Sequence, residues 1–563
     1  MNAEFVELLK RAKRWLEQDP DAETRLELEA IVSAAEAGDP EAAQELHSRF
    51  DERLAFGTAG LRGELAAGPN RMNRVLVAQA AAGLGAYLLE KAPAGRRPSV
   101  VIGYDGRKNS RVFAVDTAEL MAGAGIRAII LPRLLPTPLV AFAVRHLQVS
   151  AGVMVTASHN PPMDNGYKVY LGDADEGSQI VPPADAEIAG HILRVAEEQD
   201  IRELPRSDDY ETAGESVIAA YIEQTAALVP APEAQPQAVY TAMHGVGWET
   251  ASAVFRAAGF ETPVVVPEQI DPDPAFPTVA FPNPEEPGAL DLAYRTAEAV
   301  GAELVIANDP DADRLAIAIP DDTAPGGYRR LSGNEVGALL GWHAAERIAR
   351  AGDAASGALA CSLVSSPALA AVARHYGLGF HETLTGFKWV SRVPGLVFGF
   401  EEALGYLVDP DLVRDKDGIS AAVAFLSLAA ELKAAGSTVA ARLREFSQTF
   451  GYFASEQISI RVTELAQIAA AMSRLRSAPP AELGGIRVDR VDDLAQGFGE
   501  LPPSDVLRIW LVDGSRVVVR PSGTEPKLKV YIDAMCGEGT AEERQAVAEA
   551  AVARLSESIR QLL

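Results

Sequence analysis

Short apolar runs alternate with longer helical segments over most of this chain. The β-rich segments at residues 99–104, 239–243 and 359–364 are each followed by a loop, an Ala-rich helical stretch, a turn of small residues and a second apolar run. Repetition of strand, loop, helix and strand is typical of parallel α/β layers. The pattern predicts three α/β domains of similar build, with mixed, mostly parallel sheets.

The hydrophobic period changes beyond about residue 450. Four segments there alternate apolar and polar positions with a period of two, namely YFASEQISIRV, SDVLRIWLV, SRVVVRP and LKVYIDAM, and a helical pattern at residues 540–563 follows them. Period-two alternation indicates half-buried antiparallel strands. This part of the chain is therefore predicted to be a smaller, largely antiparallel α+β domain.

Residues 1–50 carry the pattern of two or three polar helices, separated at Pro20 and Pro40, and are predicted to form a solvated cap on the first domain. At roughly 100–200 residues per domain, the chain accommodates several domains. The predicted organisation is an N-terminal helical extension at 1–50, α/β domain I at 51–208, α/β domain II at 209–325, α/β domain III at 326–448 and α+β domain IV at 449–563.

The composition is that of a soluble globular protein with several cores, since 48% of the residues are hydrophobic and 23% are charged. The chain has two cysteines, Cys361 and Cys536. Two cysteines exclude a disulfide framework or a Cys-based zinc site and favour a reducing cytosol.

Two features of the sequence argue against membrane insertion. Glu4, Glu7 and Lys10 lie where a signal peptide needs an apolar core. The longest apolar stretch, around residues 419–432, is shorter than the roughly 20 residues that span a bilayer. A cytoplasmic protein without a membrane partner is expected.

The formal net charge is −27 and the sequence pI is near 4.8. Such a surface repels nucleic acid and anionic lipid, so neither is an expected partner. It also repels phosphorylated metabolites. A phosphate-binding function therefore needs cations concentrated at defined points.

The strongest local signal is the segment NDPDADR at residues 308–314, which lies between the apolar runs LVIA and LAIAI. Its three carboxylates, at Asp309, Asp311 and Asp313, occupy alternate positions, and in an extended segment they can point the same way. Their mutual repulsion is costly without a cation. All-oxygen ligation suits a hard divalent ion, Mg²⁺ before Zn²⁺.

Two other interpretations of this loop are weaker. An EF-hand needs Gly at its sixth position and Glu at its twelfth, where Arg314 and Pro320 stand. A solvated acidic loop remains the alternative to a metal site. Arg314 directly follows the acidic residues and is placed to clamp a phosphate held by the metal.

The second signal is TASHNP at residues 156–161, followed by DNGYK at residues 164–168. Because α/β sheets bind ligands where strands end, Ser158 is well placed for chemistry. A hydrolase lacks support, since G-x-S-x-G is absent and adjacent residues of an extended strand point to opposite faces, which makes His159 a poor base for Ser158. A helix N-cap is the structural alternative for Ser158.

The third signal is RPSGTEPK at residues 520–527, which follows a strand pattern. A guanidinium, two hydroxyls and a Gly whose N–H can approach closely are typical of a phosphate cradle, although an ordinary Gly/Pro turn is an open alternative. Two further fragments are suggestive. GFEEALGY at 399–406 offers paired carboxylates for sugar hydroxyls, and TGFK at 385–388 offers a cation.

Taken in order, FGTAGLRG at residues 56–63, TASHNP, DPDADR, FEEALG and RPSGTEPK resemble the motifs of the α-D-phosphohexomutase superfamily, which includes phosphoglucomutase and phosphomannomutase. The resemblance covers nearly the whole chain beyond the N-terminal helices. It implies a heart-shaped enzyme of four domains, each of which contributes one loop to a central cleft. The phosphoserine loop falls in domain I, the metal loop in domain II, the sugar-binding loop in domain III and the phosphate-binding loop in domain IV.

The resemblance also implies roles for single residues. Ser158 is implied to be the phosphoserine and, through its phosphate, to bind Mg²⁺ together with Asp309, Asp311 and Asp313. The other residues implied to act in catalysis are Arg62, Lys168 and Lys388, one of the lysines serving in proton transfer. The residues implied to bind the substrate are His159, Arg314, Thr385, Gly386, Glu401, Arg520, Ser522, Gly523 and Thr524.

The implied activity is that of a phosphoglucomutase, which interconverts α-D-glucose 1-phosphate and glucose 6-phosphate through a phosphoserine and a sugar bisphosphate that primes the enzyme. The chain departs from the better-known loop at Ala403, where a Ser is usual. This departure leaves phosphomannomutase and phosphopentomutase specificity open, and FGTAGLRG, DNGYKVY and FEEALGY look more like the branch that also handles pentose phosphates.

Two functions of other classes compete with a mutase. A metal-dependent phosphatase uses an Asp nucleophile and needs no second phosphate clamp. A non-catalytic sugar-phosphate sensor can dispense with both Ser158 and the aspartates. Phosphorylated sugars are the expected partners, and a monomer or a homodimer is the expected assembly.

Overall fold

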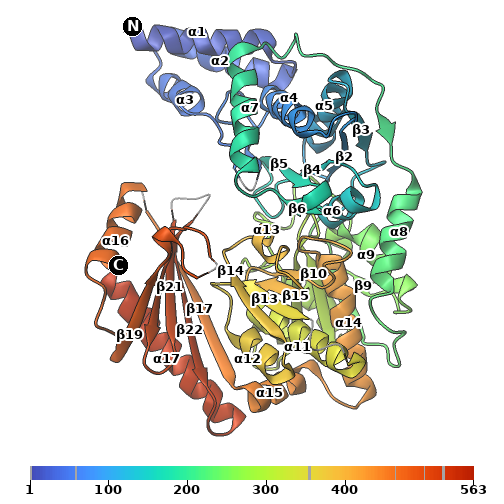
Figure 1. The fold of residues 1–563 in the computed structure, drawn as a ribbon, viewed down its shortest axis with the longest axis vertical. Coiled ribbons are helices and arrows are strands. Elements are labelled where there is room, and N and C mark those ends of the chain that lie inside the picture. Colours follow the sequence, from blue (N-terminus) through green and yellow to red (C-terminus); the bar gives the residue numbers. More distant parts are fainter. Residues whose placement is uncertain (1–2, 58–59, 353–356, 463–464, 500, 523–526) are drawn as a thin grey trace. The chain divides into compact units, whose positions relative to one another are not determined.

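The structure, a computed structural model, describes residues 3–57, 60–352, 357–462, 465–499, 501–522 and 527–563 (Figure 1). The chain divides into two compact units. The first comprises residues 1–330 and 409–427, and the second comprises residues 331–408 and 428–563.

The first unit contains a seven-stranded sheet with the order β1-β5-β4-β2-β3-β7, and β6 pairs with β5. Its strands are β1 (Leu61–Glu64), β2 (Ser99–Tyr104), β3 (Arg127–Ile130), β4 (Ala151–Val155), β5 (Asp164–Leu171), β6 (Ser178–Gln179) and β7 (Glu211–Thr212). The helices that alternate with these strands along the chain are α4 (Arg74–Lys91), α5 (Ser110–Gly123), α6 (Thr137–His146) and α7 (Ala184–Glu198). The pairs among β4, β2, β3 and β7 are parallel, whereas β5 pairs antiparallel with each of its neighbours β4, β1 and β6.

The same unit contains a five-stranded sheet with the order β12-β11-β10-β8-β9. Its strands are β8 (Ala238–Thr241), β9 (Val264–Val265), β10 (Leu304–Asn308), β11 (Leu315–Pro320) and β12 (Tyr328–Arg330). The helices of this region are α8 (Glu215–Ala226), α9 (Gly247–Ala257) and α10 (Asp291–Val300). The strands β10 and β11 pair antiparallel, so the acidic segment forms the turn of a buried hairpin.

The second unit contains a four-stranded sheet with the order β14-β13-β15-β16 and a six-stranded antiparallel sheet with the order β17-β22-β21-β20-β19-β18. The strands of the first are β13 (Ala358–Ser362), β14 (Gly379–Thr383), β15 (Leu396–Glu401) and β16 (Gly405–Leu407). Those of the second are β17 (Tyr452–Arg461), β18 (Glu482–Leu483), β19 (Ile486–Asp493), β20 (Leu507–Leu511), β21 (Arg516–Pro521) and β22 (Lys527–Cys536).

Helices accompany both sheets of the second unit. They are α11 (Gly333–Ala351), α12 (Ala368–Tyr376), α13 (Phe387–Val390), α15 (Val439–Phe450), α16 (Leu465–Ser477) and α17 (Ala541–Leu562), and α14 (Gly418–Ala434) runs from the first unit into the second. Buried residues of α16 and α17 share one apolar cluster with the six-stranded sheet, so both helices pack on one face of it. The orange-to-red part of Figure 1 shows this arrangement.

The predicted fold class is confirmed, because three mixed α/β layers with parallel strands precede an antiparallel α+β domain. The predicted strand at residues 99–104 is β2 (Ser99–Tyr104), and the C-terminal helical pattern is α17. The domain boundaries derived from the sequence stay a prediction. No single helix in the described part of the chain is long and apolar enough to cross a membrane, and α14 and α15 meet the criteria of length and composition only as a pair bent by 91°.

The N-terminal extension is more than a solvated cap. It forms three helices, α1 (Ala3–Gln18), α2 (Ala22–Glu36) and α3 (Pro40–Phe50). Side chains such as Leu28 and Leu46 are fully buried and belong to the same apolar cluster as the seven-stranded sheet. The Arg49 side chain, 8% exposed, pairs with Glu27 and Glu45 and donates to the carbonyl of Ala67. The extension is therefore part of the first domain's core.

Buried ion pairs join the two sheets of the second unit. Arg516 lies on β21, donates to Asp533 Oδ2 at 2.8 Å and to Glu382 Oε1 at 3.0 Å, and also donates to the carbonyl of Ser365. Arg508 donates to the second oxygen of Glu382 at 2.7 Å. One carboxylate at the end of β14 thus accepts from two strands of the six-stranded sheet. Buried charges are retained only when they are paired in this way.

A buried histidine predicts a pH dependence of stability. His343 on α11 is 3% exposed, and neither ring nitrogen has a hydrogen-bond partner among the described residues. Burial and the positive charges of Arg347, Arg350 and Arg442 lower its pKa to about 4, and the Glu431 carboxylate lies 3.7 Å away, too far for a hydrogen bond. The unfolded chain, with a His pKa near 6.5, therefore takes up this proton at higher pH than the folded protein does.

The free energy of unfolding is accordingly expected to fall as the pH drops from about 6.5 to about 4, by up to about 1.4 kcal/mol per pH unit from this group. Above about pH 6.5 this histidine is neutral in the folded and the unfolded state, so the free energy of unfolding no longer depends on pH through this group. Chemical unfolding at several pH values checks this, with His343→Leu expected to flatten the profile. His375→Gln, at an exposed histidine on α12, is the matched control and keeps the wild-type slope. A wild-type slope in His343→Leu contradicts the prediction.

Candidate active site

Ser158 lies in the turn that joins β4 to β5. Its side chain is buried, and its backbone has φ 52°, in the left-handed region that residues other than Gly rarely adopt. The Ser158 N–H donates to Thr156 Oγ1 at 2.8 Å. The next element is strand β5, so Ser158 is not a helix N-cap, and that alternative is wrong.

The acidic segment closes the β10–β11 hairpin as a compact turn. Ala312 adopts φ 56°, and its N–H donates to the carbonyl of Asp309. The extended segment expected from the sequence is therefore wrong, and the turn brings one oxygen of each carboxylate within 4.8 Å of the others. The hairpin is pinned from the neighbouring strand, because Tyr240 OH donates to Asn308 Oδ1 at 2.7 Å and Asn308 Nδ2 donates to the carbonyl of Arg314.

These three carboxylates fit a divalent cation. Asp309, Asp311 and Asp313 are all fully buried. Asp311 Oδ1 and Asp313 Oδ1 have no hydrogen-bond partner within the described ranges of the chain. Buried carboxylate oxygens without a donor are costly, and a hard cation with oxygen ligands satisfies them. The group can therefore hold a metal ion.

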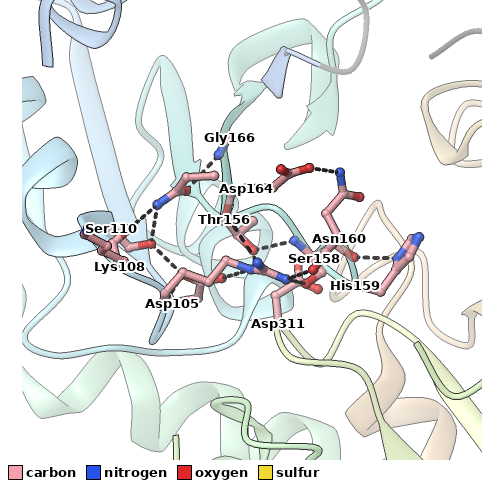
Figure 2. Close-up of polar contacts among 12 residues, drawn as sticks. Asp105, Lys108, Ser110, Thr156, Ser158, His159, Asn160, Asp164, Gly166 and Asp311 are labelled. Atoms are coloured by element: carbon pink, nitrogen blue, oxygen red, sulfur yellow. Dashed lines mark hydrogen bonds and ion pairs between the residues drawn. The ribbon is translucent and has the colours of Figure 1, made fainter. Parts of the chain in front are cut away.

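The structure brings Ser158 to this group across 151 residues of sequence. Ser158 Oγ donates to Asp309 Oδ2 at 2.8 Å. A different part of the first domain also contacts the acidic turn, since Thr137 at the start of α6 donates its N–H to the carbonyl of Asp311 and its hydroxyl to Asp311 Oδ2 at 2.6 Å. The hydroxyl and the acidic residues thus form one site, as Figure 2 shows for Ser158 and Asp311.

Two ammonium groups lie against the carboxylates. Lys168 Nζ on β5 is 2.8 Å from Asp311 Oδ2 and 2.8 Å from Asp313 Oδ2. Lys416 Nζ is 2.8 Å from the same oxygen of Asp313. Burial alone lowers the pKa of Lys168, but the two carboxylates raise it above its ordinary value, so the side chain is a cation at neutral pH.

The carboxylates themselves titrate in opposite directions. Burial, followed by the like charges of Asp311 and Asp313, holds the pKa of Asp309 well above its usual range. Burial also acts to raise the pKa of Asp311, but the attraction of Lys168 outweighs it and the pKa is lowered. Asp309 is therefore the carboxylate that most needs a cation.

Lys416 was missed by sequence reasoning. It belongs to the segment RDKDG at residues 414–418, which is part of the first unit although residues 331–408 belong to the second. Tyr170 OH and Gln179 Nε2 donate to Asp415 Oδ2 at 2.9 and 2.8 Å and anchor the segment beside β5. A lysine between two aspartates ahead of an apolar helix was the available signal.

The position of His159 corrects the sequence prediction. Adjacent residues of an extended strand point to opposite faces, which made His159 a poor base for Ser158. Because Ser158 is left-handed, the ring turns back, and His159 Nδ1 lies 3.2 Å from Ser158 Oγ. Burial and the charges of Arg314 and Arg62 hold the pKa of His159 well below its usual value, so the ring is neutral at neutral pH.

Two arginines complete the cationic side of this site. Arg62 on β1 donates to Asn160 Oδ1 at 3.2 Å, and Arg314 lies with its Nε 3.9 Å from Asp313 Oδ1. The FGTAGLRG segment needs Gly60, which has φ 76° and whose added Cβ would lie 1.9 Å from the carbonyl oxygen of Tyr167. This close approach sets β1 against β5 and thereby places Arg62.

The remaining described candidates lie in the second unit. Gly386, with φ 113°, donates its N–H to Glu401 Oε1 at 2.6 Å and so joins the TGFK segment to the end of β15. Thr385 and Lys388 flank this contact in sequence. Glu401 is held from the other side by the β15–β16 pairing with Gly405.

The neighbouring Glu402 points back into the protein. Its Oε2 accepts from Ser365 Oγ at 3.1 Å and from Ser362 Oγ at 3.3 Å. The backbone there is tight, because a Cβ at Gly333 would lie 1.9 Å from the carbonyl oxygen of Glu402. Of the paired carboxylates, Glu401 is the one turned toward the TGFK segment.

The phosphate-cradle candidates Arg520 and Ser522 lie at the end of β21. Both are partly exposed, and the N–H of Ser522 donates to the carbonyl of Lys527 at 2.8 Å. The other two candidates in this loop, Gly523 and Thr524, lie outside the described residues.

Comparison with known proteins decides the family. Four family models match in order: the alpha/beta/alpha domains I, II and III of phosphoglucomutase/phosphomannomutase at residues 53–199, 219–323 and 332–449, and the C-terminal domain at residues 458–550. The chain belongs to the phosphoglucomutase/phosphomannomutase family. The resemblance drawn from the motifs is thereby confirmed, and the chain is an enzyme of the mutase type, an intramolecular phosphotransferase.

Curated members of the family differ in the sugar named. A probable phosphomannomutase from Haemophilus influenzae is 56% identical over 82% of this chain and 93% of its own length. A probable phosphoribomutase from Schizosaccharomyces pombe is 36% identical over 92% of both chains, and the human phosphopentomutase is 34% identical over 96% of this chain and 94% of its own.

Solved structures share the fold at lower identity. A putative phosphomannomutase from Thermus thermophilus covers 91% of this chain and 99% of its own with a TM-score of 0.69 and 24% identity. A phosphoglucomutase/phosphomannomutase family protein from Burkholderia thailandensis covers 91% and 97% with a TM-score of 0.70 and 20% identity. At this identity the likeness supports the fold alone.

Proposed function

We propose that this enzyme is a Mg²⁺-dependent phosphosugar mutase that carries the phosphoryl group on Ser158, with α-D-glucose 1-phosphate and glucose 6-phosphate as its first candidate substrates. The observation that carries the proposal is the 2.8 Å contact from Ser158 Oγ to Asp309, inside a buried group of three carboxylates and beside two ammonium groups. A sensor has no need of a nucleophile at that place.

Phosphoryl transfer asks the protein mainly for positioning and charge neutralisation. In the proposed cycle, phospho-Ser158 transfers its phosphoryl group to the free hydroxyl of a sugar monophosphate, which forms a sugar bisphosphate. The bisphosphate then reorients in the site so that its two phosphates exchange places. The phosphate that the sugar first carried then returns to Ser158. Arg62, Lys168 and Arg314 neutralise the transferring group, and a sugar bisphosphate primes the cycle by phosphorylating Ser158.

The carboxylates of Asp309, Asp311 and Asp313, with the phosphate of Ser158, would hold Mg²⁺. When bound, Mg²⁺ supplies Lewis-acid polarisation of the phosphoryl oxygens. The Ser158 hydroxyl proton is directed at Asp309 Oδ2 in the structure, but the neutral ring of His159 lies 3.2 Å from Ser158 Oγ and would take this proton once the hydroxyl turns to accept phosphate. Lys168 holds its proton and acts as a charge and hydrogen-bond donor.

The second unit is proposed to bind the rest of the substrate. Glu401, Thr385 and Gly386 would contact the sugar and its hydroxyls, and Lys388 would act as a catalytic cation near the reaction centre. Arg520, Ser522, Gly523 and Thr524 would hold the phosphate that is not reacting. The two phosphates of a bisphosphate exchange places, so a clamp based on charge suits both orientations. The domain closure that excludes water is expected to accompany binding.

A second specificity has support of its own. Relatives named for mannose and for pentose phosphates match most of the chain, and Ala403 removes a hydroxyl near the proposed sugar contacts. Mannose 1-phosphate and ribose 1-phosphate are therefore the alternatives to glucose 1-phosphate.

A substrate panel tests the proposal. Glucose, mannose, glucosamine and ribose 1-phosphates are incubated with the enzyme, Mg²⁺ and a catalytic amount of glucose 1,6-bisphosphate, and products are followed by phosphorus NMR. We expect isomerisation of glucose 1-phosphate that depends on the bisphosphate, and a phosphorylated Ser158 in the intact mass and peptide map. Release of inorganic phosphate without isomerisation indicates the phosphatase. Tight binding without turnover indicates the sensor.

A further inference from the structure

A buried arginine outside the proposed catalytic set binds the backbone of the Ser158 turn. The Arg107 side chain is 1% exposed. Its Nη2 donates to the carbonyls of Ser158 and Asn160, each at 2.6 Å, and its Nη1 donates to those of Pro161 at 2.7 Å and Asp164 at 3.2 Å. One guanidinium thus donates to four carbonyls of a single turn, and Figure 2 labels Ser158, Asn160 and Asp164 among the residues that supply them.

Asp105 anchors this arginine. It follows β2, which pairs directly with β4, and its Oδ1 accepts from the N–H of Arg107 at 3.0 Å and from Ser110 Oγ at 2.6 Å. Asp105 Oδ2 lies 3.6 Å from Arg107 Nε. The two side chains form a buried ion pair at the carboxyl end of the interior strand β2, where each charge holds the other in place.

An aromatic ring from the loop between β9 and α10 of the same unit closes the site. The Arg107 guanidinium lies 4.9 Å from the centroid of the Phe276 ring, a cation–π distance. Gly106 packs closely there too, since its added Cβ would lie 3.0 Å from Cβ of Pro272. Arg107 is therefore held by this ring as well as by the carbonyls.

Hydrogen bonds hold the backbone of Ser158 at both its N–H and its carbonyl. Its N–H donates to Thr156 Oγ1, and its carbonyl accepts from Arg107. Its backbone is in the left-handed region, which other L residues rarely occupy unless neighbouring contacts impose it. In that conformation Ser158 Oγ reaches Asp309 Oδ2 at 2.8 Å and His159 Nδ1 at 3.2 Å.

Arg107 offers no accessible donor to a substrate phosphate. Of the five guanidinium N–H groups, four donate to carbonyls, and the fifth, on Nε, is buried 3.6 Å from Asp105 Oδ2, too far for a hydrogen bond. This separates it from Arg62 and Arg314, which we have assigned to the transferring group. Its position in the structure is that of a support for the nucleophile.

We infer that Arg107, anchored by Asp105, is a positioning residue that sets the direction of Ser158 Oγ for phosphoryl transfer. The inference rests on the proposed function, since it assigns a task only if Ser158 carries phosphate. Misplacing a nucleophile by about 1 Å costs on the order of 100-fold in rate without loss of binding. The expected signature is a loss in kcat with little change in KM.

The test uses the full-length enzyme with two substitutions. Arg107→Lys keeps the charge but cannot serve four carbonyls, and Asp105→Asn keeps the shape but removes the anchoring charge. We expect kcat to fall about 100-fold for Arg107→Lys, equivalent to about 2.7 kcal/mol. For Asp105→Asn we expect roughly a 10-fold loss, and for both a KM within about 3-fold of wild type. Asp105→Asn remains informative if Arg107→Lys does not fold.

A readout specific to positioning is the single-turnover rate. Phosphoenzyme is prepared with glucose 1,6-bisphosphate, the phosphorylated fraction is counted by intact mass, and transfer to glucose 6-phosphate is timed per phosphorylated molecule. A purely structural role lowers the melting temperature and the folded fraction but leaves this rate unchanged. Arg49→Lys is the matched control, because Arg49 is also buried and ion-paired but braces the N-terminal helices; it is expected to lower the melting temperature alone.

The outcomes separate the two hypotheses. If the wild type neither phosphorylates Ser158 nor isomerises a sugar phosphate, the proposed function fails and the positioning role falls with it. If the wild type does both while Arg107→Lys and Asp105→Asn transfer phosphate at the wild-type rate per molecule, only the positioning role is overturned. Slow transfer in both, with a wild-type rate in Arg49→Lys, supports it.

Discussion

Ser158→Ala is expected to lower mutase turnover by at least about 10³-fold, because in the proposed mechanism it removes the oxygen that carries phosphate between the two half-reactions. Ser158 Oγ is buried and donates to Asp309 Oδ2 at 2.8 Å. Among the described residues, the hydroxyl of Thr137 also donates to the acidic group, at Asp311 Oδ2. Initial rates with a saturating sugar bisphosphate, and the mass of the enzyme after incubation with it, are the measurements.

The variant should remain folded, since the change removes one oxygen from a side chain held by its backbone. An unchanged melting temperature and unchanged binding of glucose 6-phosphate show that the loss is chemical. Ser33→Ala, at a hydroxyl that donates to the carbonyl of Glu29 on helix α2, is the control and keeps full activity. Turnover by Ser158→Ala at the wild-type rate refutes the phosphoserine assignment and with it the mutase mechanism.

Asp311→Asn is expected to abolish the response of the protein to Mg²⁺ and to reduce turnover by about 10³-fold, the size of the several kcal/mol that a catalytic metal contributes. Its Oδ1 is buried without a hydrogen-bond donor in the described chain, and its carboxylate pairs with Lys168. Adding Mg²⁺ should raise the melting temperature of the wild type, because ligands that bind the folded state stabilise it. Chelation with EDTA should reverse both the stabilisation and the activity.

The response to Mg²⁺ is also expected to weaken as the pH falls. Burial and like charges raise the pKa of Asp309, so protons compete with the metal for this carboxylate at a higher pH than for an exposed aspartate. Calorimetric titration with Mg²⁺ at pH 8 and pH 6 measures the change. Asp492→Asn, at a buried aspartate paired with Arg508 in the second unit, is the control and should cost stability without altering metal binding. An Asp311→Asn variant with wild-type Mg²⁺ affinity rules out the metal site.

The order of strands and helices followed from local sequence. A continuous apolar run predicts a buried strand, and Ser99–Tyr104 and the hairpin strands around the acidic segment are found where the pattern placed them. Helix α17 likewise follows from its periodicity and its Thr540 capping box. Each signal lies within one segment, so no knowledge of other segments was needed.

The motifs also named the chemistry. Three carboxylates at alternate positions and a serine after a strand end predicted a metal group and a nucleophile, and the two lie together in the first unit. The residues Lys416 and Arg107 were not found, because their partners lie 103 and 51 positions away in sequence for the contacts to Asp313 and Ser158. A pattern read along one segment carries no record of such partners.

The sequence by itself determined which residue types are available at the ends of buried strands, because strand patterns and loop composition are local properties. Only the tertiary structure decided the geometry of the nucleophile. The left-handed backbone of Ser158 brings His159 Nδ1 to 3.2 Å from its hydroxyl, where the rule for an extended strand placed the ring on the opposite face. That conformation is held by Thr156 and by Arg107, which lies in the loop after the neighbouring strand β2, and the two loops come together only once the sheet has formed.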